Sequence, residues 1–134
     1  MKILKYLLLI LFLASASTYA QKYRFKTSSF MVSNKDKKGN WGEWSKPEKS
    51  KMIVLLDMES HRIVVYSEVI QLFTILGYDD PKTNDEGSLD TFHCVDNDGE
   101  KCILTIRTDN KSKQKQLYIR EDSRVLVYNM KYIK

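Results

Sequence analysis

The sequence predicts an all-β fold, and two observations lead to this class. Beyond the first twenty residues, short runs rich in Val, Ile, Tyr and Thr recur with turn residues between them, and no run of ten or more residues shows the 3.6-residue apolar period of an amphipathic helix. In addition, Pro47 and Pro81 both fall between these runs, where a missing N–H breaks no strand pairing.

The first element has the layout of a secretory signal peptide. Lys2 and Lys5 precede an apolar run over 6–14, and small residues follow up to Ala20. The apolar run is shorter than the roughly 18 to 20 residues that a membrane span needs, so no stable membrane anchor is expected after cleavage. Cleavage after Ala20 leaves residues 21–134 as a single domain, exported to the periplasm or secreted.

Eight runs of this domain are predicted strands. They cover 22–33, 51–57, 62–66, 69–76, 89–96, 101–108, 115–121 and 124–130. Most loops between them are short, so consecutive strands should pair as antiparallel neighbours in an up-and-down meander. A closed or partly open barrel is the first expectation. A β-sandwich is the alternative, because the alternation of side chains along each strand is the same in both.

The last hairpin has a register that follows from its loop. If residues 122–123 form a two-residue turn, Ile119 lies opposite Leu126 and Leu117 lies opposite Tyr128. This apolar face is predicted core. The other face is mixed and carries Tyr118, Arg120, Val125, Val127 and Asn129. We expect it to be exposed, with partial cover by a loop, an oligomer contact or a ligand as the alternative.

The two cysteines belong to a hairpin whose turn is Asn97-Asp98-Gly99. A three-residue loop of this kind needs a positive φ at its third residue, which glycine adopts without steric cost. The resulting register places Cys94 directly opposite Cys102, at a Cα separation that a disulfide accepts. In an oxidising compartment this arrangement predicts a structural disulfide between Cys94 and Cys102.

A metal site at the same place is not expected. Zinc takes four ligands, and His93 points to the opposite face of its strand from Cys94. No nucleophile elbow or phosphate-binding glycine loop occurs either, so the sequence indicates no cofactor.

The charge balance argues against nucleic acid as a partner. The whole chain has a net charge of +5, and without Lys2 and Lys5 the predicted mature domain has 20 basic and 17 acidic residues, a net charge of +3. The basic residues are scattered over several loops, which is typical of solvated surface rather than of a phosphate-binding patch.

Two tryptophans form the most unusual stretch of the mature domain, Gly39-Asn40-Trp41-Gly42-Glu43-Trp44-Ser45. Trp41 and Trp44 either form an aromatic rim that binds a sugar or a peptide, or close one end of the barrel. Both interpretations remain open at this point.

Gly39-Asn40-Trp41 resembles the G-x-W element near the first strand of lipocalins and streptavidin-like barrels, which implies a barrel fold. More broadly, the chain is similar to small exported all-β proteins of Gram-negative bacteria that have no assigned function. The features shared are the signal peptide, WGEWS, HRIVVYS, the opposed cysteines and QLYI. This similarity implies export and names no activity.

We therefore expect a non-catalytic binding module for a small molecule or a peptide, which uses Trp41, Trp44 and one mouth of the barrel. An envelope protein that acts by protein–protein contacts is the alternative, because Tyr118, Val125 and Val127 make the second face of the last hairpin partly apolar. A hydrolase with a dispersed site is the third hypothesis. It needs His61 or His93, and its site would be assembled from separated residues such as Asp57, His61, Tyr66 and Glu68.

Overall fold

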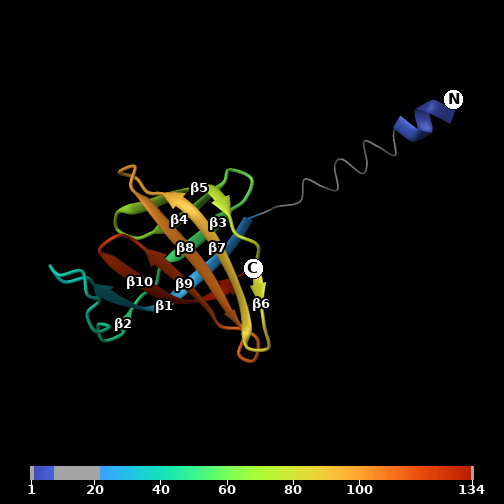
Figure 1. Cartoon of the computed structure of the whole chain (residues 1–134). Helices are drawn as coiled ribbons and strands as arrows, with labels where there is room; N and C mark the ends of the chain where they lie inside the picture. Colours follow the sequence, from blue (N-terminus) through green and yellow to red (C-terminus); the bar gives the residue numbers. More distant parts are fainter. Residues whose placement is uncertain (1, 8–21, 134) are drawn as a thin grey trace.

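The computed structural model describes residues 2–7 and 22–133 (Figure 1). Residues 2–7 are helical, and the rest of the described chain consists of strands and their connections. The strands are β1 (Lys22–Asn34), β2 (Glu48–Lys49), β3 (Ile53–Asp57), β4 (Arg62–Tyr66), β5 (Ile70–Tyr78), β6 (Lys82–Thr83), β7 (Gly87–Val95), β8 (Lys101–Asp109), β9 (Lys115–Arg120) and β10 (Arg124–Ile133).

Most of the predicted signal peptide, including its cleavage site, falls on residues 8–20, which lie outside the described residues. Within the described part of the chain, no helix is both long and apolar enough to span a membrane.

Eight of the strands close into an antiparallel barrel. Neighbours in the meander β3-β4-β5-β7-β8-β9-β10 pair in sequence order, and β1 pairs with β3 on one side and with β10 on the other. The β1–β10 pairing runs from Arg24 opposite Ile133 to Asn34 opposite Arg124, so the first and last strands join along their length. The predicted meander is confirmed, and the β-sandwich alternative is wrong. β2 adds to β1, and β6 adds to β7.

Both hairpin registers that the turns predicted are confirmed. Ile119 lies opposite Leu126, and the Glu121 N–H donates to the Arg124 carbonyl at 2.9 Å, which closes the two-residue turn. Cys94 lies opposite Cys102, and Gly99 has a φ of +82° at the third position of its loop.

The interior of the barrel is filled by apolar side chains. Successive residues of a strand point to opposite faces, so every second residue of each strand points inward. An eight-stranded barrel has an interior just wide enough for such side chains to fill. Among the inward residues, Ile63, Leu104, Leu117 and Ile119 are fully buried, and the rest of the core includes Phe25, Val54, Val65, Phe73, Phe92, Leu126, Tyr128 and Met130.

Several strand ends differ from the predicted ones. β5 continues to Tyr78 instead of residue 76, β7 begins at Gly87 instead of residue 89, and β10 continues to Ile133 instead of residue 130. Strand length depends on how far the partner strand offers backbone groups, and the partner of the end of β10 is β1, about one hundred residues earlier in the chain. The two-residue strands β2 and β6 were not predicted, because two residues carry no recognisable alternation.

The second face of β10 corrects another prediction. Val125 and Val127, which were expected to be exposed, are both buried. Ser33 of β1 lies opposite Val125, is itself buried, and donates from its hydroxyl to the Gly42 carbonyl at 2.9 Å. The β1–β3 connection is therefore held against this part of the barrel. The two valines offer no apolar surface to another protein, so the main support for the interface hypothesis is lost.

Two names for the ends of the barrel are used below. The strap end carries the β3–β4 turn, the β8–β9 turn and the β5–β7 connection, residues 79–86, which we call the strap. The hairpin end carries the β4–β5, β7–β8 and β9–β10 turns (Figure 1). The strap contains β6 and runs beside β7.

Candidate functional site

A hollow of about 550 Å³ lies in the mouth of the barrel at the strap end, and we call it the mouth hollow. Its floor is made of core side chains that point along the barrel interior, namely Phe25, Leu56, Phe92 and Ile106. Its rim includes Tyr23, Met58, Tyr78, Asp90 and the first residues of the strap. The hollow therefore has an apolar base and a mixed edge.

The rim of the mouth hollow is ordered by contacts to the barrel. Tyr78 packs edge-on against Phe92 with ring centroids 5.9 Å apart. Its hydroxyl is hydrogen-bonded to Nδ1 of His61, on the β3–β4 turn, at 3.3 Å. A tyrosine held in this way presents an apolar ring toward the hollow and keeps its polar group at the edge, an arrangement that suits an apolar ligand.

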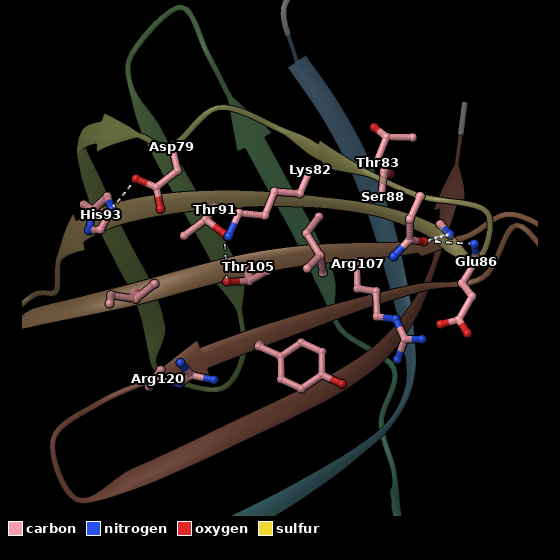
Figure 2. Close-up of a pocket in the computed structure, with 15 residues that line it drawn as sticks. Asp79, Lys82, Thr83, Glu86, Ser88, Thr91, His93, Thr105, Arg107 and Arg120 are labelled. Atoms are coloured by element: carbon pink, nitrogen blue, oxygen red, sulfur yellow. Dashed lines mark hydrogen bonds and ion pairs between the residues drawn. The ribbon is translucent and has the colours of Figure 1, made fainter.

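A second hollow, of about 660 Å³, lies on the outside of the barrel, and we call it the strap groove (Figure 2). Strand alternation decides its lining: Phe92, Leu104 and Ile119 point inward, so their neighbours in the sequence point outward. The outward side chains that line the groove are Leu89, Thr91, His93, Ile103, Thr105, Arg107, Tyr118 and Arg120, and the strap supplies the other wall.

The strap is fixed to the barrel at both of its ends. Asp79 accepts a hydrogen bond from Nε2 of His93 at 2.9 Å, which Figure 2 shows as a dashed line. At the far end, the Asn84 side chain accepts from the N–H of Gly87 at 3.0 Å, and the Asn110 amide donates to the Asn84 carbonyl at 3.2 Å. Asp79 lines both the strap groove and the mouth hollow, so the strap separates the two.

Positive charge predominates in the strap groove. Arg107 and Arg120 reach it from β8 and β9, and Lys82 reaches it from the strap (Figure 2). Among the described residues, neither arginine has an ion-pair partner. The carboxylate of Asp79 is paired with His93, and Glu86 is the other carboxylate in the lining of the groove. The groove is thus suited to a ligand that carries negative charge.

A third hollow, of about 540 Å³, continues the strap groove toward the hairpin end, and we call it the Trp41 hollow. The two share His93, Ile103 and Arg120. At its other side stands Trp41, with Nζ of Lys35 at 5.0 Å from the centre of its ring. The outer face of β7, β8 and β9 is therefore hollowed from the strap to Trp41.

The two tryptophans predicted to bind a ligand lie away from the mouth hollow. Trp41 and Trp44 are 47% and 49% exposed, so neither acts as a buried plug at an end of the barrel. Both follow β1, whose last residues lie at the hairpin end, whereas the mouth hollow is at the strap end. Trp41 lines an external hollow, and Trp44 lines none of the three hollows described above.

Cys94 and Cys102 face each other as predicted, but in the structure both are free and buried, so the predicted disulfide is not formed there. Register brings the two Cβ atoms together, whereas a bridge also requires side-chain torsions that bring the sulfurs into contact. Burial raises the pKa of Cys94 to about 12, with the neighbouring Cys102 adding to the effect, and burial raises that of Cys102 to about 11, assisted by Asp96 and Glu121. Both groups are therefore neutral thiols near neutral pH.

The residues proposed for a dispersed hydrolase site are not brought together. His61 and Asp57 lie at the strap end, whereas Tyr66 and Glu68 lie at or beyond the other end of β4, about 16 Å away along the strand. His93 lies on the outer face and is paired with Asp79. Within residues 2–7 and 22–133, no cluster of three or more His, Cys, Asp or Glu side chains has the arrangement of a metal site.

Comparison of the chain with models of protein families, with curated proteins and with solved structures found no match. The functional argument consequently depends on the geometry of the hollows.

Proposed function

We propose that this protein is a non-catalytic binding module that takes a small apolar molecule into the mouth hollow. The observation that carries the proposal is the apolar floor of this hollow, where Phe25, Leu56, Phe92 and Ile106 end the packed core beneath a tyrosine-bearing rim. Mouths of β-barrels are frequent sites for small ligands, and a volume of about 550 Å³ falls within the usual range.

The charges at the rim narrow the class of ligand. Asp80 and Asp90 line the hollow on one side, and Lys115 is the lysine that faces it. Lys115 also donates from Nζ to the Thr108 hydroxyl at 2.8 Å. A neutral or weakly cationic molecule therefore suits the rim better than an anion.

A neutral fluorescent probe, N-phenyl-1-naphthylamine, tests this proposal. Its emission rises when it leaves water, and we expect saturable binding by the wild-type protein. The double variant Tyr23→Ser/Tyr78→Ser removes both rim rings, and Asp90→Phe places a large side chain in the hollow. Each should weaken probe binding several-fold, since burial of apolar surface supplies the affinity.

Tyr66→Ser is the matched control. Tyr66 is 45% exposed, between Tyr23 at 43% and Tyr78 at 50%, but it lies at the hairpin end. Equal loss of probe binding in Tyr66→Ser and in the rim variant, or wild-type affinity in Asp90→Phe, would contradict the assignment of the ligand to the mouth hollow.

The proposal includes two expectations that come from the sequence. The chain is exported with removal of residues 1–20, and Cys94 and Cys102 become joined in the oxidising compartment. The opposed register and the shared burial of the two thiols support the bridge. The denatured mass of the exported protein, compared with that of a reduced sample, tests both: cleavage sets the chain mass, and the bridge lowers it by two hydrogen atoms.

A further inference from the structure

The strap groove and the Trp41 hollow form one elongated depression on the outer face of β7, β8 and β9, because they share His93, Ile103 and Arg120. Its length matters for the type of ligand. Arg120 lies opposite Ile103, and Arg107 is four residues further along β8, which separates the two positions by about 13 Å along the strands. Figure 2 shows Arg107 and Arg120 set apart, with Thr91 and Thr105 on the same side of both.

Charge in this depression favours a ligand with more than one anionic group. Arg107, Arg120 and Lys82 contribute positive charge in the strap groove, and Lys35 and Lys101 contribute it in the Trp41 hollow. Glu121, which also lines the Trp41 hollow, is paired with Arg124 through two hydrogen bonds of 2.7 and 3.1 Å. Asp79 is paired with His93, so the other carboxylates of the lining are Glu86 and Asp122, and the five cationic side chains outnumber them. Two separated guanidinium groups without ion-pair partners among the described residues suit carboxylates spaced along a chain.

The neutral lining of the strap groove is rich in hydroxyl and amide groups. Thr91 and Thr105 share a hydrogen bond of 3.4 Å, and Thr83, Asn84 and Ser88 line the strap side. Trp41 adds a half-exposed aromatic ring at the far side. Hydroxyl and amide donors and acceptors beside an aromatic face are the groups that a ligand rich in hydroxyls can use.

The same face is poorly suited to an extended peptide. A peptide that binds as an added strand needs unpaired backbone groups at a sheet edge. β7, β8 and β9 are each paired with strands on both sides, so their backbone groups are occupied within the barrel. Leu89 and Ile103 are the aliphatic side chains of the strap groove, which leaves little to recognise alternate apolar residues of a peptide.

We propose that this depression binds an acidic polysaccharide, with carboxylates of the sugar chain on Arg107 and Arg120 and a sugar ring against Trp41. This site is separate from the mouth hollow and does not depend on the binding of an apolar molecule there. The strap lies between the two sites, with Asp79 in the lining of both.

Calorimetric titration with oligogalacturonate, a chain of sugar rings that each carry a carboxylate, tests the proposal. We expect binding that weakens as salt is added, because the carboxylate contacts are exposed to solvent. Arg107→Gln and Arg120→Gln should each weaken it about tenfold, which corresponds to the loss of one charge-assisted contact. The fully methyl-esterified oligomer has no charge and should not bind measurably.

Arg24→Gln is the matched control, because Arg24 is an exposed arginine on the outer face of β1 and lines none of the three hollows. Its affinity should equal that of the wild type. Three results would overturn the proposal: no binding of oligogalacturonate, equal weakening in Arg24→Gln and the two groove variants, or binding of poly-L-glutamate as tight as that of the sugar. The last result would identify a site for acidic peptides.

Discussion

Cys94 on β7 and Cys102 on β8 occupy directly opposed positions in the barrel, and both point into its core as free thiols. Burial keeps them protonated, with pKa values of about 12 and about 11. At pH 8 the thiolate fraction of Cys102 is on the order of one part in a thousand, and that of Cys94 is smaller. A pair of this kind is unreactive when reduced, since the thiolate is the nucleophile.

The reduced protein should therefore lose stability at high pH. Below the ordinary thiol pKa of 9.0 both thiols are neutral in the folded and unfolded chain, and no effect is expected. Above it the unfolded chain releases these protons while the folded chain retains them. The free energy of unfolding then falls with rising pH by up to about 1.4 kcal/mol per pH unit for each thiol, until the folded pKa is reached. Urea unfolding at pH 8 and pH 10.5 measures this.

The double variant Cys94→Ala/Cys102→Ala provides the comparison for this measurement. Between the two pH values it should lose less stability than the reduced wild type, because the titrating groups are absent. An identical loss in both proteins would show that other groups, such as Tyr128, whose pKa is raised mainly by burial, account for the alkaline effect.

Gly87→Ala should destabilise the protein and disturb the strap. Gly87 starts β7, and a Cβ atom there would overlap with the backbone carbonyl of Thr108 on β8. Because the overlapping atoms belong to the backbone, β7 and β8 must shift relative to each other. This shift should lower the free energy of unfolding by about 1 to 3 kcal/mol. Urea unfolding measures the change. Gly77→Ala is the matched control on β5, where a Cβ would meet no atom within 4 Å, so its unfolding midpoint should stay near that of the wild type.

Asp57→Asn should lower the stability of the protein at neutral pH more than at acid pH. Asp57 is 1% exposed and accepts from the Ser60 N–H at 3.1 Å and from Nε of Arg62 at 3.3 Å. Burial raises the pKa of this carboxyl, but the bonds from Ser60 and Arg62, together with the charges of Lys22 and Arg62, outweigh burial and lower it. Its stabilising contribution is therefore present above the ordinary pKa of 3.8 and is lost as the pH falls through the lower folded value.

Thermal unfolding between pH 6 and pH 2 tests this prediction. The difference in melting temperature between wild type and Asp57→Asn should shrink as the pH decreases. Glu59→Gln in the same turn is the control, because Glu59 makes a single exposed ion pair of 3.9 Å with Lys22 and should contribute little. A difference that stays constant over this pH range would contradict the role assigned to the carboxylate charge.

The two tryptophans can report on the outer depression separately, since they are the two tryptophans of the whole chain. In Trp44→Phe, Trp41 is the remaining reporter, and its emission should change when oligogalacturonate fills the Trp41 hollow. In Trp41→Phe, the emission of Trp44 should not change. If the emission of Trp44 changed and that of Trp41 did not, the placement of a sugar ring against Trp41 would be wrong.

The sequence predicted the features that depend on residues close together in the chain, and it did not predict the features that depend on contacts between distant segments. The Asn97-Asp98-Gly99 turn and the turn at 122–123 set the registers of their hairpins from residues a few positions apart, and both registers are confirmed. The end of β10 and the burial of Val125 depend on contacts with β1 and with the β1–β3 connection. These segments lie about one hundred residues earlier in the chain. Local alternation carries no information about such a partner.

The sequence by itself determined the all-β class, the order of the main strands and the inward face of the last hairpin, because turn chemistry and a two-residue period act locally. Only the tertiary structure decided that β1 and β10 close the barrel, that Trp41 lies on the outer face at the end opposite the mouth hollow, and that Arg107 and Arg120 line one groove beneath the strap. These facts depend on the closure of a ring of strands and on the path of long connections over it, and both are fixed when distant segments pack together.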